Sequence, residues 1–139
     1  MNYQLNFSDL IEYDTTKAGI TLDIELKFGG AAQTVSAKLD TGSTDCIFAR
    51  AVGESLGLPI ENGKPASIGT ATGTFRAYLH EVTLSVLDFD FEVYVYFAED
   101  ENFKRNVLGR TGFLDRVVLG LVDYEGKLFL TATTNEQFL

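Results

Sequence analysis

The chain has 139 residues, of which 45% are hydrophobic and 12% aromatic, values typical of one globular domain covering residues 1–139. Its formal net charge of −9, from 20 acidic and 11 basic residues, argues against nucleic acid as a partner, because phosphate contacts need clustered Lys and Arg. No apolar run approaches the roughly 20 residues of a membrane helix, so we expect no membrane partner.

The single cysteine and the single histidine limit the chemistry further. Cys46 alone excludes an internal disulfide and a cysteine-based zinc cluster, and His80 alone excludes a multi-histidine metal site. One thiol fits a reducing compartment, and we expect a cytoplasmic protein. Cys46 is interpreted as a small buried hydrophobe rather than a nucleophile, since nothing in the sequence brings His80 beside it. The acidic residues 99–101 lack the ligand spacing of a calcium loop, so no metal or cofactor is expected.

Along the chain, apolar residues recur mostly at every second position, which predicts half-buried strands separated by glycine-containing turns. The predicted strands cover residues 20–28, 35–39, 46–48, 75–79, 82–86, 89–97, 117–122 and 128–130. Two short helices are expected, at residues 49–56 with Gly57 as the stop and at residues 111–116. These elements predict an all-β domain, closed or sandwich-like.

One motif stands at the end of a predicted strand. The alternating segment 35–39 leads directly into Asp40, followed by Thr41 and Gly42. Asp-Thr-Gly by itself is typical of a turn, in which Asp and Thr side chains accept backbone hydrogen bonds and Gly takes a positive φ. The surrounding strands and the segments downstream favour a catalytic interpretation.

Three segments, in this order, resemble the retropepsin-like aspartic proteases. The first is Ala-Lys-Leu-Asp-Thr-Gly-Ser at residues 37–43. The second is a glycine-containing hairpin at residues 68–74, in the place of the flap, and the third is Asn-Val-Leu-Gly-Arg at residues 106–110 before a short helix. The resemblance spans roughly residues 18–130. It implies an all-β acid-protease fold, a closed barrel with one or two short helices, and an endopeptidase acting on extended polypeptide.

The resemblance also implies a homodimer. An aspartic protease needs two carboxylates that share one proton, because like charges about 3 Å apart cannot both ionise. The ionised carboxylate activates a water and the protonated one polarises the scissile carbonyl. Since the chain has one Asp-Thr-Gly, the second Asp40 would come from another copy, related by a two-fold axis. No cofactor takes part in this chemistry.

Roles for individual residues follow from the same resemblance. Asp40 would be catalytic, Thr41 would bond across the dimer, Gly42 would admit the substrate backbone, and Ser43 would donate a hydrogen bond that favours the charged Asp40. The expected flap residues are Ile68, Gly69, Thr70, Ala71, Thr72 and Gly73. The segment expected to pack beside the active-site loop consists of Val107, Leu108, Gly109 and Arg110.

Several points stay open at this stage. Arg110 would either pair with Asp45 or lie free on the surface. The ends of the chain, residues 1–7 and 131–139, would form an intersubunit sheet, as the ends do in retroviral members. The alternatives to a general endopeptidase are a latent dimerisation or peptide-binding module of the same fold and a processing enzyme with a single partner.

Overall fold

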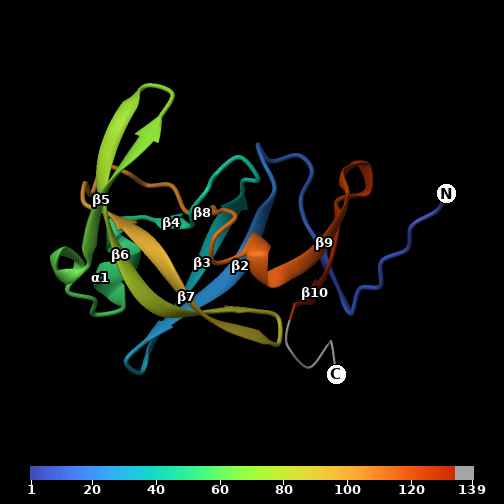
Figure 1. Ribbon diagram of the computed structural model, residues 1–139, viewed down its shortest axis with the longest axis horizontal. Helices are drawn as coiled ribbons and strands as arrows, with labels where there is room; N and C mark the ends of the chain where they lie inside the picture. The colour runs from blue at the N-terminus through green and yellow to red at the C-terminus, as the bar shows by residue number, and fades with distance from the viewer. Residues whose placement is uncertain (134–139) are drawn as a thin grey trace.

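The computed structural model describes residues 1–133 and has a closed barrel as its main body (Figure 1). Its strands are β2 (Thr21–Phe28), β3 (Ala31–Leu39), β4 (Ile47–Phe48), β5 (Lys64–Thr70), β6 (Gly73–Val86), β7 (Phe89–Ala98) and β8 (Val107–Leu108). They form one sheet in the order β2-β3-β8-β4-β7-β6-β5. Because β2 also pairs with β6, the sheet closes on itself. The expected all-β closed barrel is confirmed.

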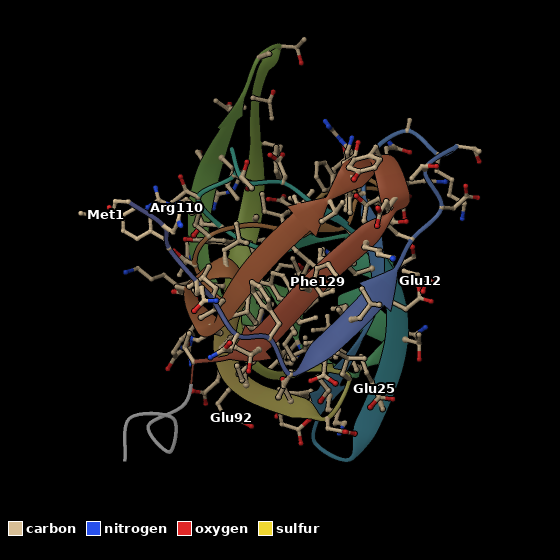
Figure 2. The ribbon with its side chains drawn as sticks, turned by 90° about the vertical axis from the view of Figure 1, so that its right-hand side faces the viewer. Met1, Glu12, Glu25, Glu92, Arg110 and Phe129 are labelled. Carbon is tan, nitrogen blue, oxygen red and sulfur yellow. The ribbon has the colours of Figure 1, made fainter. Side chains whose placement is uncertain are left out.

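A separate three-stranded sheet brings one strand from the first part of the chain together with two strands from its last part. Its order is β1 (Asp9–Glu12), β10 (Lys127–Ala132) and β9 (Val117–Val122), all antiparallel. Figure 2 looks onto this sheet, with Phe129 near its centre. Residues 1–7 precede it outside any strand, and Phe7 packs on Phe129 with ring centroids 5.9 Å apart. The expected intersubunit sheet remains a prediction, and residues 134–139, which it would include, lie outside the described residues.

The period of two in the first half of the chain builds the barrel core. Leu22, Ile24 and Leu26 are buried on β2, and Val35 and Ala37 are buried opposite them on β3. The intervening residues face solvent or are half-buried. Burying one face of both strands stabilises the hairpin by roughly 1.5–3 kcal/mol for each fully buried aliphatic side chain of Val or Leu size. The same packing fixes the register in which β3 delivers Asp40.

The expectation of two strands at residues 75–79 and 82–86 was wrong in one respect, because β6 is a single strand. The buried side chains lie on different faces in the two parts of the strand. Ala77, at an odd-numbered position, is buried in the first part, whereas Val82 and Leu84, at even-numbered positions, are buried in the second. The backbone nevertheless pairs continuously with β7 from Ala77 to Val86. The hydrogen-bonded ladder therefore keeps one strand intact where the side-chain pattern suggests a break.

The helices are short. The helix α1 (Arg50–Ser55) is followed by Gly57 at φ +76°, as the sequence predicted. The helix expected at residues 111–116 is reduced to a 3₁₀ turn, η2 (Leu114–Arg116). Gly112 at φ +101° cannot lie in a right-handed helix, and the Thr111 N–H bonds to the Thr44 carbonyl instead of starting one. Two further 3₁₀ turns are η1 (Ile60–Asn62) and η3 (Asp123–Glu125).

Among residues 1–133, no helix has the length and apolar character needed to cross a membrane. The expected cytoplasmic location stays a prediction.

Candidate active site

Asp40 lies where β3 ends, held there by the short strand β8. The two strands run parallel, with Lys38 opposite Val107 and Leu39 opposite Leu108. The Asp40 N–H donates to the Leu108 carbonyl at 2.9 Å. Leu39 is buried while Asp40 is exposed, so the strand end is anchored in the core and its next side chain emerges at the surface. Val107 and Leu108 thus lie beside the strand end that carries Asp40.

The loop after Asp40 folds back on the carboxylate. The Gly42 N–H donates to Asp40 Oδ1 at 2.9 Å, and the Ser43 N–H donates to the Asp40 carbonyl at 3.1 Å. Asp40, Thr41 and Gly42 are all exposed. One carboxylate oxygen is thus oriented by a backbone donor, a charge-assisted hydrogen bond that fixes the side chain.

The structure differs from the sequence-based expectation at Ser43. Its hydroxyl donates to the Asp45 carbonyl at 2.7 Å rather than to the Asp40 carboxylate. The turn brings that carbonyl within reach of the Ser43 side chain two residues earlier, a local bond typical of serine in turns. Ser43 therefore stabilises the shape of the loop, and the expected hydrogen bond favouring charged Asp40 is absent from the described chain.

Gly109 and Arg110 secure the other side of the loop. The Arg110 N–H donates to the Ser43 carbonyl at 2.9 Å. A Cβ placed on Gly109 would lie 2.2 Å from the Asp45 carbonyl oxygen, so only glycine allows this close approach. The Arg110 side chain is exposed, and no ion pair joins it to Asp45 within residues 1–133. Of the two alternatives for Arg110, the surface position is the one observed.

A cleft of about 760 Å³ opens beside Asp40, under the β5–β6 hairpin. This hairpin projects from the barrel in both views (Figures 1 and 2). Its register pairs Ile68 with Phe75 and Thr70 with Gly73, so the expected flap segment is a regular hairpin with its tip at residues 71–72. Residues 66–72 line the cleft together with Asp40, Gly42 and Ser43. The structure thus brings two of the three predicted segments to one cavity, and Val107 of the third lines it as well.

Other lining residues were not assigned to the site from the sequence. Phe75 on β6 stacks on Phe103 with ring centroids 4.5 Å apart, and Arg105 lies over the Phe103 ring at 5.7 Å. All three line the cleft, as does half-buried Tyr96. The available signal was the position of Phe103 and Arg105 just before the segment 106–110.

Two titratable groups near the loop have pKa values displaced by burial. Desolvation raises the pKa of Asp45, which lines the cleft. Desolvation also raises the pKa of the Cys46 thiol to about 12. Cys46 is fully buried, with its sulfur accepting the Gly109 N–H at 3.4 Å, so the interpretation of a buried small side chain is confirmed. His80 lies elsewhere, with Nε2 2.8 Å from the Ile60 carbonyl.

Two of the acidic residues 99–101 have structural contacts. Glu99 pairs with Arg76 at 3.2 Å and accepts a hydrogen bond from Tyr78, while Asp100 Oδ1 accepts the Asn102 N–H at 2.8 Å. Within the described range 1–133, no group of three or more His, Cys, Asp or Glu side chains is arranged to hold a metal ion.

Comparison with known proteins identifies the family. A sequence profile described as "Aspartyl protease" matches residues 24–111, more than half of the chain, including the Asp40 loop, the hairpin and β8. The chain belongs to the aspartyl protease family. A search of curated proteins found no match.

Solved structures place this aspartyl protease family member in the retropepsin-like fold. A retropepsin-like aspartic protease from Rickettsia conorii is similar, with a TM-score of 0.64 and 16% identity over 88% of this chain and 97% of that one. EIAV protease in complex with an inhibitor is also similar, with a TM-score of 0.54 and 18% identity over 68% of this chain and 84% of that one. At these identities the likeness establishes the fold.

Proposed function

We propose that this chain is an aspartic endopeptidase that becomes active as a homodimer, with one Asp40 from each subunit. The observation that carries the proposal is the Asp40 carboxylate, fixed at the end of β3, exposed, and lining the cleft under the β5–β6 hairpin. A catalytic carboxylate must reach both substrate and solvent water, and this one has the access required. Membership of the aspartyl protease family supports the same reaction.

The proposed mechanism uses the two carboxylates as one unit. At about 3 Å separation one Asp40 would hold a proton and the other would be ionised. The ionised carboxylate takes a proton from a water, which attacks the scissile carbonyl, while the protonated carboxyl donates to the carbonyl oxygen. The Gly42 N–H, 2.9 Å from Asp40 Oδ1, restricts rotation of the side chain and so preorganises the pair.

The surrounding residues take supporting roles in this proposal. Thr41, which is exposed, would bond to its counterpart across the two-fold axis, and Gly42 would let the substrate backbone approach. Ser43 keeps its place in the site through its bond to the Asp45 carbonyl. The flap would consist of Ile68, Gly69, Thr70, Ala71, Thr72 and Gly73. The supporting segment would consist of Val107, Leu108, Gly109 and Arg110.

The substrate would be an extended polypeptide. A strand-like peptide in the cleft could hydrogen-bond to the backbone of the β5–β6 hairpin, as peptides do at exposed sheet edges. Hairpin opening and closing would admit the peptide and exclude water around it. We further propose that residues 1–139 form one domain, and no cofactor enters the mechanism.

The test compares the wild type with Asp40→Asn on a proteome-derived peptide mixture over a range of pH. Because both subunits of the proposed dimer carry the substitution, both catalytic carboxylates are lost, and cleavage is expected to fall by at least roughly 100- to 10,000-fold. Pepstatin is expected to inhibit the wild type. Asp88→Asn is the matched control, since Asp88 lies exposed in the β6–β7 turn. Equal cleavage by wild type and Asp40→Asn would refute the mechanism. A stable dimer that binds peptides without cleaving them would instead indicate the latent binding module.

A further inference from the structure

Among the described residues, the cleft beside Asp40 is lined by two acidic side chains and one basic side chain. Asp40 and Asp45 lie on the side of the active-site loop, and Arg105 is the one basic residue among the lining residues of the described chain. The whole chain carries a net charge of −9, so a positively charged side chain in this cleft has the opposite sign to the net charge of the chain. An isolated cation of this kind is suited to select a substrate group of opposite charge.

The protein holds Arg105 in place from two sides. Its guanidinium lies over the Phe103 ring at 5.7 Å, and Phe103 stacks on Phe75 of the flap strand β6 with centroids 4.5 Å apart. The next residue, Asn106, is fixed by two bonds: its carbonyl accepts the Lys38 N–H at 2.8 Å and its Oδ1 accepts the Ala49 N–H at 3.0 Å. The contact with the Phe103 ring and the anchoring of Asn106 restrict the Arg105 side chain. Arg105 therefore loses less conformational entropy on binding a ligand than an unrestrained arginine would.

The donors of Arg105 remain available. Three other arginines, Arg50, Arg76 and Arg116, have carboxylate partners within 4.0 Å. Within residues 1–133 no carboxylate makes such a pair with Arg105, although Asp40 and Asp45 line the same cleft. A guanidinium whose N–H groups have no carboxylate partner can bind a carboxylate in a bidentate arrangement.

We infer that Arg105 is a specificity-determining residue, and that the subsite bounded by Phe75, Phe103 and Arg105 takes an acidic side chain, Asp or Glu, of the peptide substrate. The inference rests on the proposed function and names the substrate class of the same cleft. The aromatic rings would pack on the methylene groups of the side chain while Arg105 binds its carboxylate. In a two-fold dimer the subsite occurs twice, once on each side of the cleaved bond.

The experiment uses pairs of peptides that differ only by Glu against Gln, scanned across the positions that flank a cleaved bond. At one flanking position on each side of the cleaved bond, the wild type is expected to prefer the Glu peptide by about 2- to 5-fold in kcat/KM, the range of an exposed ion pair. This preference should decrease as salt is added. Arg105→Gln should bring this ratio to about one. Arg105→Glu should reverse it in favour of a Lys peptide, a reversal that loss of loop structure would not produce.

Lys104→Gln is the matched control, because Lys104 is the exposed neighbour of Arg105 and does not line the cleft. It should leave the Glu-to-Gln ratio unchanged. A wild-type ratio of one at every position, or an equal ratio in wild type and Arg105→Gln, would overturn the inference.

A binding measurement separates this inference from the proposed function. Fluorescence anisotropy with the Asp40→Asn protein should show tighter binding of the Glu peptide, dependent on Arg105. If the wild type cleaves no peptide but this binding preference is found, the catalytic proposal fails and the subsite stands. If the wild type cleaves peptides and neither assay shows the preference, the subsite is refuted and the catalytic proposal stands.

Discussion

At the scale of single residues, the geometry of the site depends on one close approach of backbone to backbone. Gly109 faces the carbonyl oxygens of Ser43 and Asp45, and an added Cβ would lie 2.7 and 2.2 Å from them. Both oxygens belong to the loop that carries Asp40. Because both are backbone atoms, the loop can accommodate a side chain at residue 109 only by moving as a whole.

Gly109→Ala is therefore expected to reduce the free energy of unfolding by about 1–3 kcal/mol or more, the cost of overpacking a fixed site. Chemical denaturation monitored by tyrosine fluorescence or circular dichroism measures the change. Gly69→Ala is the matched control, since a Cβ there meets nothing within 4 Å and its φ is not positive. Equal stability of the two variants would contradict the steric argument.

Sequence reasoning placed Asp40, the proposed catalytic residue, at the end of a strand, but it did not identify the hydrogen-bond partners of the neighbouring residues. The placement of Asp40 was predictable because an alternating strand ends on it and two matching segments follow downstream. The partner of Ser43 was not, because a hydroxyl can reach several acceptors in a turn and only the folded loop selects the Asp45 carbonyl. Arg105 was not assigned to the site because its proposed role depends on a contact with the Phe103 ring in the folded chain, which no spacing rule encodes.

At the scale of elements, an ion pair with two hydrogen bonds connects the short helix α1 to the 3₁₀ turn η1 that follows it. Arg50, at the start of α1, donates to both carboxylate oxygens of Glu61 of η1 through Nη1 and Nη2, with an Nη1–Oε2 distance of 2.9 Å. Its Nη1 also donates to the Glu99 carbonyl at 3.1 Å. The hydrogen bond from Arg50 holds the pKa of Glu61 below its usual value of 4.5. A helix of 6 residues gains little from its own hydrogen bonds, so such tertiary contacts matter for it.

The pH dependence of this contact has a definite sign. A carboxylate with a lowered folded-state pKa contributes stability that is fully present above its unfolded-state pKa and is lost as pH falls through the folded value. Glu61→Gln should therefore lower the melting temperature at pH 7 and have a smaller effect at an acidic pH, because protonation of Glu61 removes the same ion pair that the substitution removes. Glu101→Gln, at an exposed residue without an ion pair in the described range, is the control. A Glu61→Gln effect that is equal at both pH values would exclude the charge as its cause.

Most strands were predictable because burial on one face produces a period of two. The exceptions have physical causes. β6 pairs with β5 in the hairpin and with β7 and β2 in the barrel, so its buried side changes while its backbone pairing continues. The segment 111–116 has helical composition, yet Gly112 and the bond from Thr111 to Thr44 direct its backbone elsewhere. Tertiary contacts override local propensity at both places.

At the scale of the whole molecule, Asp40, Thr41 and Gly42 are exposed and so accessible to a second copy of the chain. In the proposed mechanism this second copy supplies the other carboxylate of the dyad. A net charge of −9 opposes association of two identical chains, so the proposed dimer should be favoured by added salt. Activity and self-association should therefore change together.

Mixing experiments test this coupling directly. An equal amount of Asp40→Asn protein is added to the wild type, above the dissociation constant of the dimer and with free exchange of subunits. The total number of dimers then doubles, and random pairing makes one quarter of them fully wild-type. Activity should therefore fall to about half of its value before the addition. Adding Asp88→Asn protein instead should raise total activity. Unchanged activity after addition of Asp40→Asn protein would show that each chain works alone. Sedimentation velocity at the same concentrations reports the dimer fraction.

The attachment of the Asp40 loop also explains how this fold tolerates extensive change in sequence. Four backbone hydrogen bonds hold the loop, donated by the N–H groups of Lys38, Asp40, Arg110 and Thr111. Backbone bonds are insensitive to the side chains attached, provided that the donor is not proline. Most positions around the loop are therefore free to diverge while its shape persists, consistent with a shared fold at 16% identity to the Rickettsia conorii protein.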